Sequence, residues 1–208
     1  MQYMHALSTL FGSETRVKVM RLFLFNPEET FDTETLVLRS RANARDIKNE
    51  VADLSKAGLI KSRAYVKEIE QKRGSKLVIV KKKTRGYYLD GSFVYLPQLQ
   101  ALLINTKFLR HEDLAQRLSS AGRIKLLIAA GVFTQDWESR VDLLIVGDNI
   151  KKSKLDKIVR AMESEIGKEL TYAAFETADF QYRLGMYDKL LRDILDFPHE
   201  KVINKLSV

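Results

Sequence analysis

A predicted helix over residues 44–56 carries side chains suited to nucleic-acid recognition. Ile47, Val51 and Leu54 recur at helical spacing and form the face that we expect to be buried. The rest of the helix is polar and basic. In the major groove, arginine can bind both acceptors of guanine, and asparagine can bind the donor and the acceptor of adenine. The pattern therefore predicts contacts to DNA from Arg45, Lys48, Asn49 and Lys56.

The segments around this helix indicate how it would be held. A shorter helix is expected over residues 33–39 and a polar turn over residues 40–43, where Asn43 can cap the next helix. Two basic, β-branched runs follow, at residues 59–69 and 76–83. Helix, turn, helix and basic hairpin together resemble the winged helix-turn-helix family. Basic side chains on such a hairpin are expected to contact phosphates. The hairpin adds Lys72, Arg73 and Lys76 to the predicted DNA-binding set, and the turn before the second helix adds Arg41 and Asn43.

The distribution of charge supports a polyanionic partner for the first half of the chain. Residues 1–90 hold 18 Lys and Arg against 11 Asp and Glu, whereas residues 91–208 hold 17 against 16. Between Arg39 and Arg85 the count is 15 against 5. Such an asymmetry favours binding to a polyanion. The alternative is a solvated basic surface, and lysines on the hairpin can also protect a strand edge from pairing with another chain.

The remaining periodicities predict two domains, at residues 1–90 and 91–208. In the first, residues 7–25 read as one scaffold helix, in which Gly12-Ser13 supplies a candidate N-cap. Residues 84–96 read as the passage out of the domain. In the second, short apolar runs predict strands and amphipathic stretches predict helices. The expected fold class is a two-domain α+β and α/β chain. The expected strands of the second domain are residues 124–130, 141–146, 170–175 and 202–203, with a helix over residues 151–166.

The segment from Arg123 to Asp148 resembles the core of the polymerase-beta-like nucleotidyltransferases in their minimal form. That family carries Gly-Ser after one strand and Ser-Asp-x-Asp on the next. Its aspartates, with a third acid, hold two divalent metals. Here Arg140 stands in place of the first aspartate, Asp142 is retained, and Gly131 is followed by valine. The whole chain is similar to proteins that fuse a winged helix to such a domain.

These departures predict a nucleotidyltransferase-like domain without catalysis. A cation in place of one acid removes a metal ligand and adds a repelling charge, so we expect no metal, no cofactor and no catalytic residue. The domain can still bind a nucleotide or another small ligand, with Gly131, Trp137 and Asp142 as candidate ligand-binding residues. An acidic cluster is a further possibility, although solvated acids are the simpler interpretation of Asp136, Glu138, Asp142, Asp148 and Glu169.

We therefore expect a DNA-binding transcriptional regulator whose second domain senses a ligand or forms a homodimer. A homodimer is expected because many helix-turn-helix regulators bind two half-sites. Two alternatives stay open: an active nucleotidyltransferase that modifies a protein or RNA partner, and a protein-interaction module. The chain has no cysteine and no apolar run of about 20 residues, which favours a cytoplasmic protein without disulfides or a membrane span.

Overall fold

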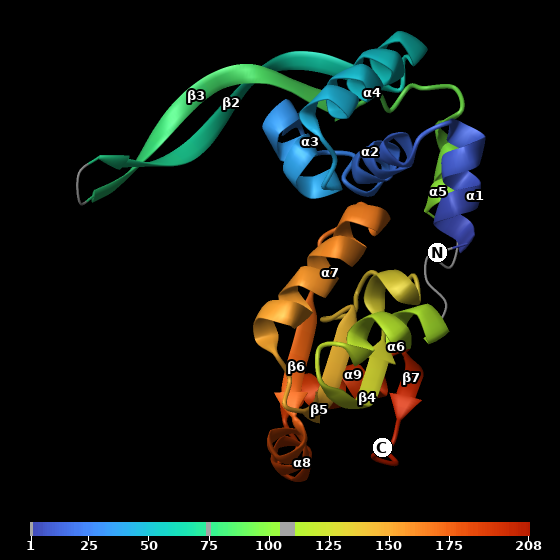
Figure 1. Cartoon of the computed structure of the whole chain (residues 1–208), viewed down its shortest axis with the longest axis vertical. Coiled ribbons are helices and arrows are strands. Elements are labelled where there is room, and N and C mark those ends of the chain that lie inside the picture. Colours follow the sequence, from blue (N-terminus) through green and yellow to red (C-terminus); the bar gives the residue numbers. More distant parts are fainter. Residues whose placement is uncertain (1, 74–75, 105–110) are drawn as a thin grey trace. The chain divides into compact units, whose positions relative to one another are not determined.

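A computed structural model describes the backbone of residues 2–73, 76–104 and 111–208 and the side chains of residues 5–69, 78–104 and 112–208. It contains helices and two β-sheets (Figure 1), so the prediction of a mixed α and β fold is confirmed. The chain divides into two compact units. The first contains residues 4–104 and 164–168, and the second contains residues 1–3, 105–163 and 169–208.

The first unit consists of helices beside a three-stranded antiparallel sheet. The strand order is β1-β3-β2, and β2 and β3 form a long hairpin that extends away from the helices of this unit (Figure 1). Phe23 and Phe31 meet edge to face in its core, with ring centroids 5.5 Å apart. The elements are α1 (Gln2–Phe11), α2 (Glu14–Phe25), β1 (Phe31–Asp32), α3 (Thr33–Ser40), α4 (Ala44–Ala57), β2 (Ile60–Arg73), β3 (Lys76–Leu89) and α5 (Leu96–Leu103).

The prediction of one helix over residues 7–25 is wrong. Gly12 has a φ of 81°, which lies outside the helical region, and separates α1 from α2. Ser13 then caps α2, because its side chain accepts a hydrogen bond of 3.1 Å from the backbone N–H of Arg16. The N-cap that the sequence indicates at Gly12-Ser13 is therefore confirmed at Ser13, and only the continuous helix across it is wrong.

The prediction that residues 84–96 lead out of the first domain is wrong for residues 84–89. These residues continue β3, and Gly86 and Tyr87 pair with Asp32 and Phe31 of β1. A side chain at Gly86 would place its Cβ 2.4 Å from Cγ2 of Thr30. The glycine therefore permits β1 to approach β3, and the chain leaves the sheet only after Leu89.

The second unit contains a four-stranded sheet of order β6-β5-β4-β7. β5 and β6 are parallel and the other pairs antiparallel, so α7 serves as the crossover between β5 and β6. The four predicted strands correspond to β4–β7, with ends displaced by one or two residues. The elements are α6 (His111–Ser119), β4 (Arg123–Ala129), the 3₁₀ helix η1 (Gly131–Phe133), β5 (Leu143–Asp148), α7 (Lys152–Ile166), β6 (Tyr172–Glu176), α8 (Thr177–Gly185), α9 (Lys189–Asp196) and β7 (Glu200–Asn204).

The last two helices close one core of the second unit. Phe180 of α8 and Leu191 and Ile194 of α9 pack in one buried cluster with Leu126 of β4 and Leu144 of β5. This burial holds α8 and α9 on the sheet through their apolar faces. Among the described residues, no helix is long and apolar enough to cross a membrane.

Candidate nucleic-acid interface

Both ends of α4 are fixed by local hydrogen bonds. At its start, Oδ1 of Asn43 accepts from the backbone N–H of Asp46 at 2.8 Å. At its end, Gly58 adopts a φ of 83° and donates its N–H to the carbonyls of Leu54 and Ser55. These are the capping arrangements expected for Asn and Gly at helix ends. The helix is therefore held in one register before any partner binds.

The buried face of α4 is the one that its periodicity predicted. Ile47, Val51 and Leu54 are buried, and so is Glu50, which interrupts the apolar pattern. Glu50 is paired with Arg16 of α2, whose Nε lies 2.6 Å from Oε2 of the carboxylate. Sequence reasoning missed this ion pair, although an acid on an otherwise apolar face is a signal for a buried partner. The pair joins α2 to α4.

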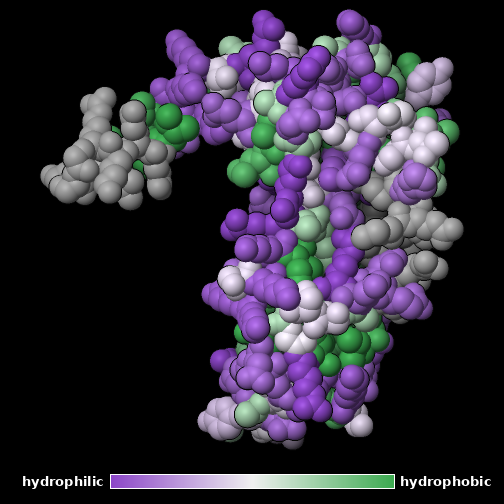
Figure 2. Space-filling model, in the orientation of Figure 1, coloured by the Kyte–Doolittle hydropathy of each residue, from purple (hydrophilic) through white to green (hydrophobic). Residues whose placement is uncertain are grey.

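The opposite face of α4 leaves its basic side chains available. Arg45, Lys48, Asn49 and Lys56 are all exposed. Within the part of the chain that the structure describes, none of these four side chains forms an ion pair or a side-chain hydrogen bond. The visible surface over α4 is mostly hydrophilic (Figure 2). One face of α4 thus packs against the core, whereas the opposite, cationic face is uncommitted, meaning that its side chains form no ion pair with the described residues.

Two further predicted DNA-binding residues lie in the turn before α4. Arg41 is exposed and has a φ of 51°, which lets the chain turn between α3 and α4. The side-chain amide of Asn43 is engaged twice, because Oδ1 caps the helix and Nδ2 donates to Asp46. Asn43 therefore has a structural role that is independent of DNA.

Near the middle of its two strands, the hairpin is joined by ion pairs to Asp32, the residue before α3, and to Glu34 in the first turn of α3. Nζ of Lys67 lies 3.0 Å from Oδ2 of Asp32, and one carboxylate, that of Glu34, lies 3.6 Å from Lys67 and 3.5 Å from Lys82. Burial alone would raise the pKa of Asp32, but hydrogen bonds from Thr35 and Lys67 hold it below its ordinary value. Burial lowers the pKa of Lys67, yet the bonds to Asp32 and Glu34 keep it raised.

The other cations of the hairpin fall into three groups. Lys61 pairs with Asp90, Lys81 pairs with Glu68, and Arg63 donates to Thr30 and lies over the ring of Tyr88. Lys83 and Arg85 are exposed and make no ion pair with the described residues. The side chains of Lys72, Arg73 and Lys76 lie outside the described residues, and only their backbone register is given, with Arg73 opposite Lys76. The predicted DNA-binding set therefore spans the turn before α4, the exposed face of α4 and the hairpin.

In the second unit, the carboxylate of Asp142 is occupied by backbone groups. It is 6% exposed, Oδ1 accepts from the N–H of Val132 at 2.8 Å, and Oδ2 accepts from the N–H of Thr171 at 2.8 Å. Gly131 lies against it, since an added Cβ would stand 2.3 Å from Oδ1. Asp142 and Gly131 are thus brought together, and the acid fastens the loop after β4 to the segment before β6.

The other residues of the expected ligand site do not join them in a metal site. Arg140 pairs through Nε with Oδ2 of Asp193 at 2.8 Å, and Trp137 is 54% exposed. Asp148 lies 2.9 Å from Nζ of Lys125 and accepts from Thr177. Among the residues that the structure describes, no group of three acids, histidines or cysteines could hold a metal ion.

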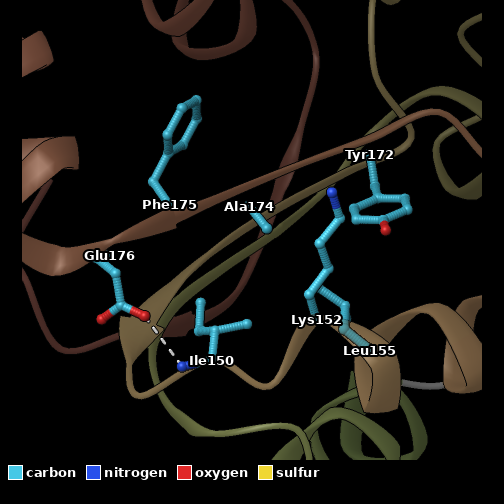
Figure 3. Close-up of a pocket in the computed structure, with 7 residues that line it drawn as sticks. All are labelled: Ile150, Lys152, Leu155, Tyr172, Ala174, Phe175 and Glu176. Carbon is cyan, nitrogen blue, oxygen red and sulfur yellow. Dashed lines mark hydrogen bonds between the residues drawn. The ribbon is translucent and has the colours of Figure 1, made fainter.

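A pocket lies along β6 and the start of α7 (Figure 3). Its volume is about 400 Å³, and Ala174 lies between Lys152 and Tyr172 at one end and Glu176 at the other. The Glu176 carboxylate accepts from the backbone N–H groups of Asn149 and Ile150. Tyr172 donates to Asp156, and burial together with this bond raises the pKa of Tyr172 to about 12. Sequence reasoning did not identify this pocket.

Comparison of the chain with protein-family models, with curated proteins and with solved structures found no match. The geometry of the two units is therefore the basis for the function proposed below.

Proposed function

We propose that the first unit is a winged helix-turn-helix that binds duplex DNA, and that the protein is a transcriptional regulator. The uncommitted cationic face of α4, opposite an anchored apolar face, carries this proposal. A basic helix held at both ends and on one side is suited to enter a groove with little loss of conformational freedom. The order α2, β1, α3, α4, β2, β3 fits the winged family.

The major groove of B-form DNA is the surface that suits this face. It is wide enough for an α-helix, and its base edges offer acceptors to arginine and lysine. The corresponding groove of A-form RNA is deep and narrow, so a helix does not reach the bases there. Arg45, Lys48 and Asn49 lie in the first turns of α4, where recognition helices touch bases.

The test is a DNA-binding titration by fluorescence anisotropy over a series of salt concentrations. The double variant Arg45→Gln/Lys48→Gln should bind duplex DNA at least about tenfold more weakly and lower the steepness of the salt dependence by about 2, because each phosphate contact contributes about 0.9. Its free energy of unfolding should stay within about 0.5 kcal/mol of the wild type, since neither side chain has a partner in the described residues.

A matched control distinguishes the effect of the charges on α4 from the effect of lowering the net charge of the protein. Lys189→Gln/Arg192→Gln removes the same charge from α9 in the other unit, and should leave DNA binding unchanged. Equal binding by wild type and the α4 variant would refute the proposal. Binding to an RNA duplex as tight as to DNA would also refute groove recognition by α4.

For the second unit, we propose ligand sensing in the pocket beside β6 in preference to the loop around Asp142. The observation that favours the pocket is that both oxygens of Asp142 already accept backbone N–H groups, whereas Ala174 leaves open space. ATP binding by calorimetry should be abolished by Ala174→Phe and retained by Trp137→Phe. The reverse result would favour the loop, and no binding of ATP would remove nucleotide sensing from the proposal.

The same geometry counts against the alternative of an active nucleotidyltransferase. A metal at Asp142 would have to reach a carboxylate that is buried and whose two oxygens each already accept a backbone N–H group. Incubation with labelled nucleoside triphosphates and Mg²⁺ should therefore give no incorporation into protein or RNA. Incorporation by the wild type that is lost in Asp142→Asn would support the alternative of an active nucleotidyltransferase. A homodimer remains part of the proposal, and light scattering at working concentration checks it.

A further inference from the structure

One edge of the second sheet is an unprotected strand. β6 pairs with β5 on one side, and on its other side no described residue pairs with its backbone (Figure 1). Proteins commonly protect such an edge with a lysine, a proline or a bulge. β6 reads Tyr-Ala-Ala-Phe-Glu and its register with β5 is regular, so it has none of these. An edge of this kind can pair with a strand of another chain.

The hydrogen bonding to β5 determines which backbone groups of β6 face outward. The N–H of Leu143 donates to the carbonyl of Thr171, the residue before β6, at 3.3 Å. Successive residues of a strand turn their N–H and C=O to opposite sides, so those of Tyr172, Ala174 and Glu176 lie at the outer edge. The side chains of the same three residues line the pocket on one face of the sheet (Figure 3).

The outward groups of β6 are self-complementary about a two-fold axis at Ala174. In an antiparallel pair, two opposed residues that face each other exchange both of their N–H···O=C bonds. Centring the pair on Ala174 sets this residue opposite its own copy and sets Tyr172 opposite the partner's Glu176. Up to about six backbone hydrogen bonds then form, and every outward N–H and C=O of β6 has a partner.

Charge favours a second copy of the chain over an unrelated strand. Lys152 lies beside Tyr172 at one end of the pocket, and Glu176 lies at the other end (Figure 3). Antiparallel pairing about Ala174 therefore brings the partner's Glu176 towards Lys152, and symmetry repeats this pair. Opposite charges at such positions stabilise strand pairing. Lys152 is exposed and forms no ion pair with the described residues.

Glu176 and the neighbouring part of α7 can accept this arrangement. Glu176 is exposed, unlike Asp142, and although each of its oxygens accepts one backbone N–H, each keeps a further lone pair for an ammonium group. Close to Tyr172, α7 presents charges of both signs, Asp156 and Arg160. The edge therefore carries no field of one sign that would repel an identical edge.

We infer that the β6 edges of two copies of this chain pair antiparallel around Ala174 and form one continuous sheet across a homodimer. This rests on the homodimer of the proposed function, and it assigns the surface that forms it. Because only about five residues of each strand pair, the interface is small, and we expect a dissociation constant in the micromolar range.

The test places opposite charges at the two-fold axis. Ala174→Lys and Ala174→Glu each set like charges against each other in the dimer, so either variant alone should have a dissociation constant at least about tenfold higher than the wild type. An equal mixture of the two should associate about as tightly as the wild type, because lysine then faces glutamate. Sedimentation velocity without nucleotide or DNA measures all three samples, and circular dichroism and the Tm check that each variant is folded.

A matched control changes the charge beside the edge. Ala178→Lys and Ala178→Glu, at an exposed position in the first turn of α8, should dimerise like the wild type. Ala174→Cys gives an independent readout, since the chain has no cysteine of its own. Opposed Cα atoms of such a pair stand about 5.5 Å apart, within the range of a disulfide. Copper–phenanthroline in air should link Ala174→Cys into dimers at least about tenfold faster than Ala178→Cys.

The possible failures are distinguishable. A wild-type dimer that persists in both charged Ala174 variants, or equally fast linking of the two cysteine variants, would overturn the β6 surface and leave the homodimer itself intact. Dimers lost in both variants and not restored by mixing would overturn the two-fold register. A wild type that stays monomeric up to about 100 μM would overturn the inference together with the homodimer, even if it binds an extended valine–threonine peptide, the other occupant of such an edge. DNA binding by α4 is tested separately by Arg45→Gln/Lys48→Gln, which leaves β6 unchanged.

Discussion

The sequence predicts a binding role for both the exposed face of α4 and the loop around Asp142. The two regions differ in whether their charged side chains already have partners within the protein. Arg45 and Lys48 have no partner within the described residues. Asp142 is buried and both of its oxygens accept backbone N–H groups. A charge already used to join segments of the chain is not available to a ligand without a loss of stability. A charged side chain without a partner inside the protein is therefore a candidate for binding, whereas one that already holds backbone groups together is structural.

The largest effect should come from Asp142→Ala. The substitution removes two charge-assisted hydrogen bonds and leaves the buried N–H group of Val132 and the part-buried N–H group of Thr171 without acceptors. We expect the free energy of unfolding to fall by about 3–5 kcal/mol. Chemical denaturation measures it. Glu138→Ala, an exposed acid in the same loop, is the control and should stay within about 0.5 kcal/mol. Equal stability of the two variants would show that Asp142 is not a structural group.

Gly131→Ala should be nearly as damaging. Its φ of 55° is unfavourable for alanine, and the new Cβ would stand 2.3 Å from Oδ1 of Asp142. Strain and overpacking together predict a loss of about 3 kcal/mol. Gly185→Ala is the matched control, because no atom lies within 4 Å of its Cβ position. It ends α8, and alanine there should stabilise by about 0.5 kcal/mol. A tolerated Gly131→Ala would mean that this loop rearranges readily.

A smaller effect distinguishes the two roles of Asn43. Asn43→Ala removes the cap of α4 and should cost about 1 kcal/mol, whereas Asn43→Ser keeps a capping oxygen and should cost little. Thermal unfolding gives both values. DNA affinity sharpens the test, because Asn43→Ser should bind like the wild type if the residue only caps. Weaker DNA binding by a fully stable Asn43→Ser would place Asn43 among the DNA-contacting residues.

The smallest effect is the dependence of stability on pH at Asp32. Because its folded pKa lies below its ordinary value, the stabilisation is present above about pH 4 and declines as the pH falls through the folded pKa. Asp32→Asn keeps a cap for α3 but removes the charge that faces Lys67. The two proteins should differ by about 1 kcal/mol at pH 7 and converge in acid.

The control for this pH series is Glu28→Gln. Glu28 is an exposed acid that forms no ion pair with the described residues, so this variant should follow the wild type throughout. A difference in stability between wild type and Asp32→Asn that persists unchanged at pH 2 would show that the contact between Asp32 and Lys67 does not depend on the charge of Asp32.

Much of the local structure could be predicted because it depends on residues a few positions apart. The apolar repeat at Ile47, Val51 and Leu54 gave the buried face of α4. Apolar runs located all four strands of the second sheet to within two residues. The errors arose where a local signal was under-weighted, as at Gly12, or where pairing extended a strand beyond its apolar run, as at Tyr87.

The sequence by itself determined most of the segments that become helices and strands, and it determined that basic residues gather between Arg39 and Arg85. Only the tertiary structure decided which of these charges are free. Arg16 pairs with Glu50, Lys67 with Asp32, and Asp142 with the backbone of Thr171, across 34, 35 and 29 positions of the chain. The physical reason is that a charge is committed by its neighbours in space, and folding brings those neighbours from distant parts of the sequence.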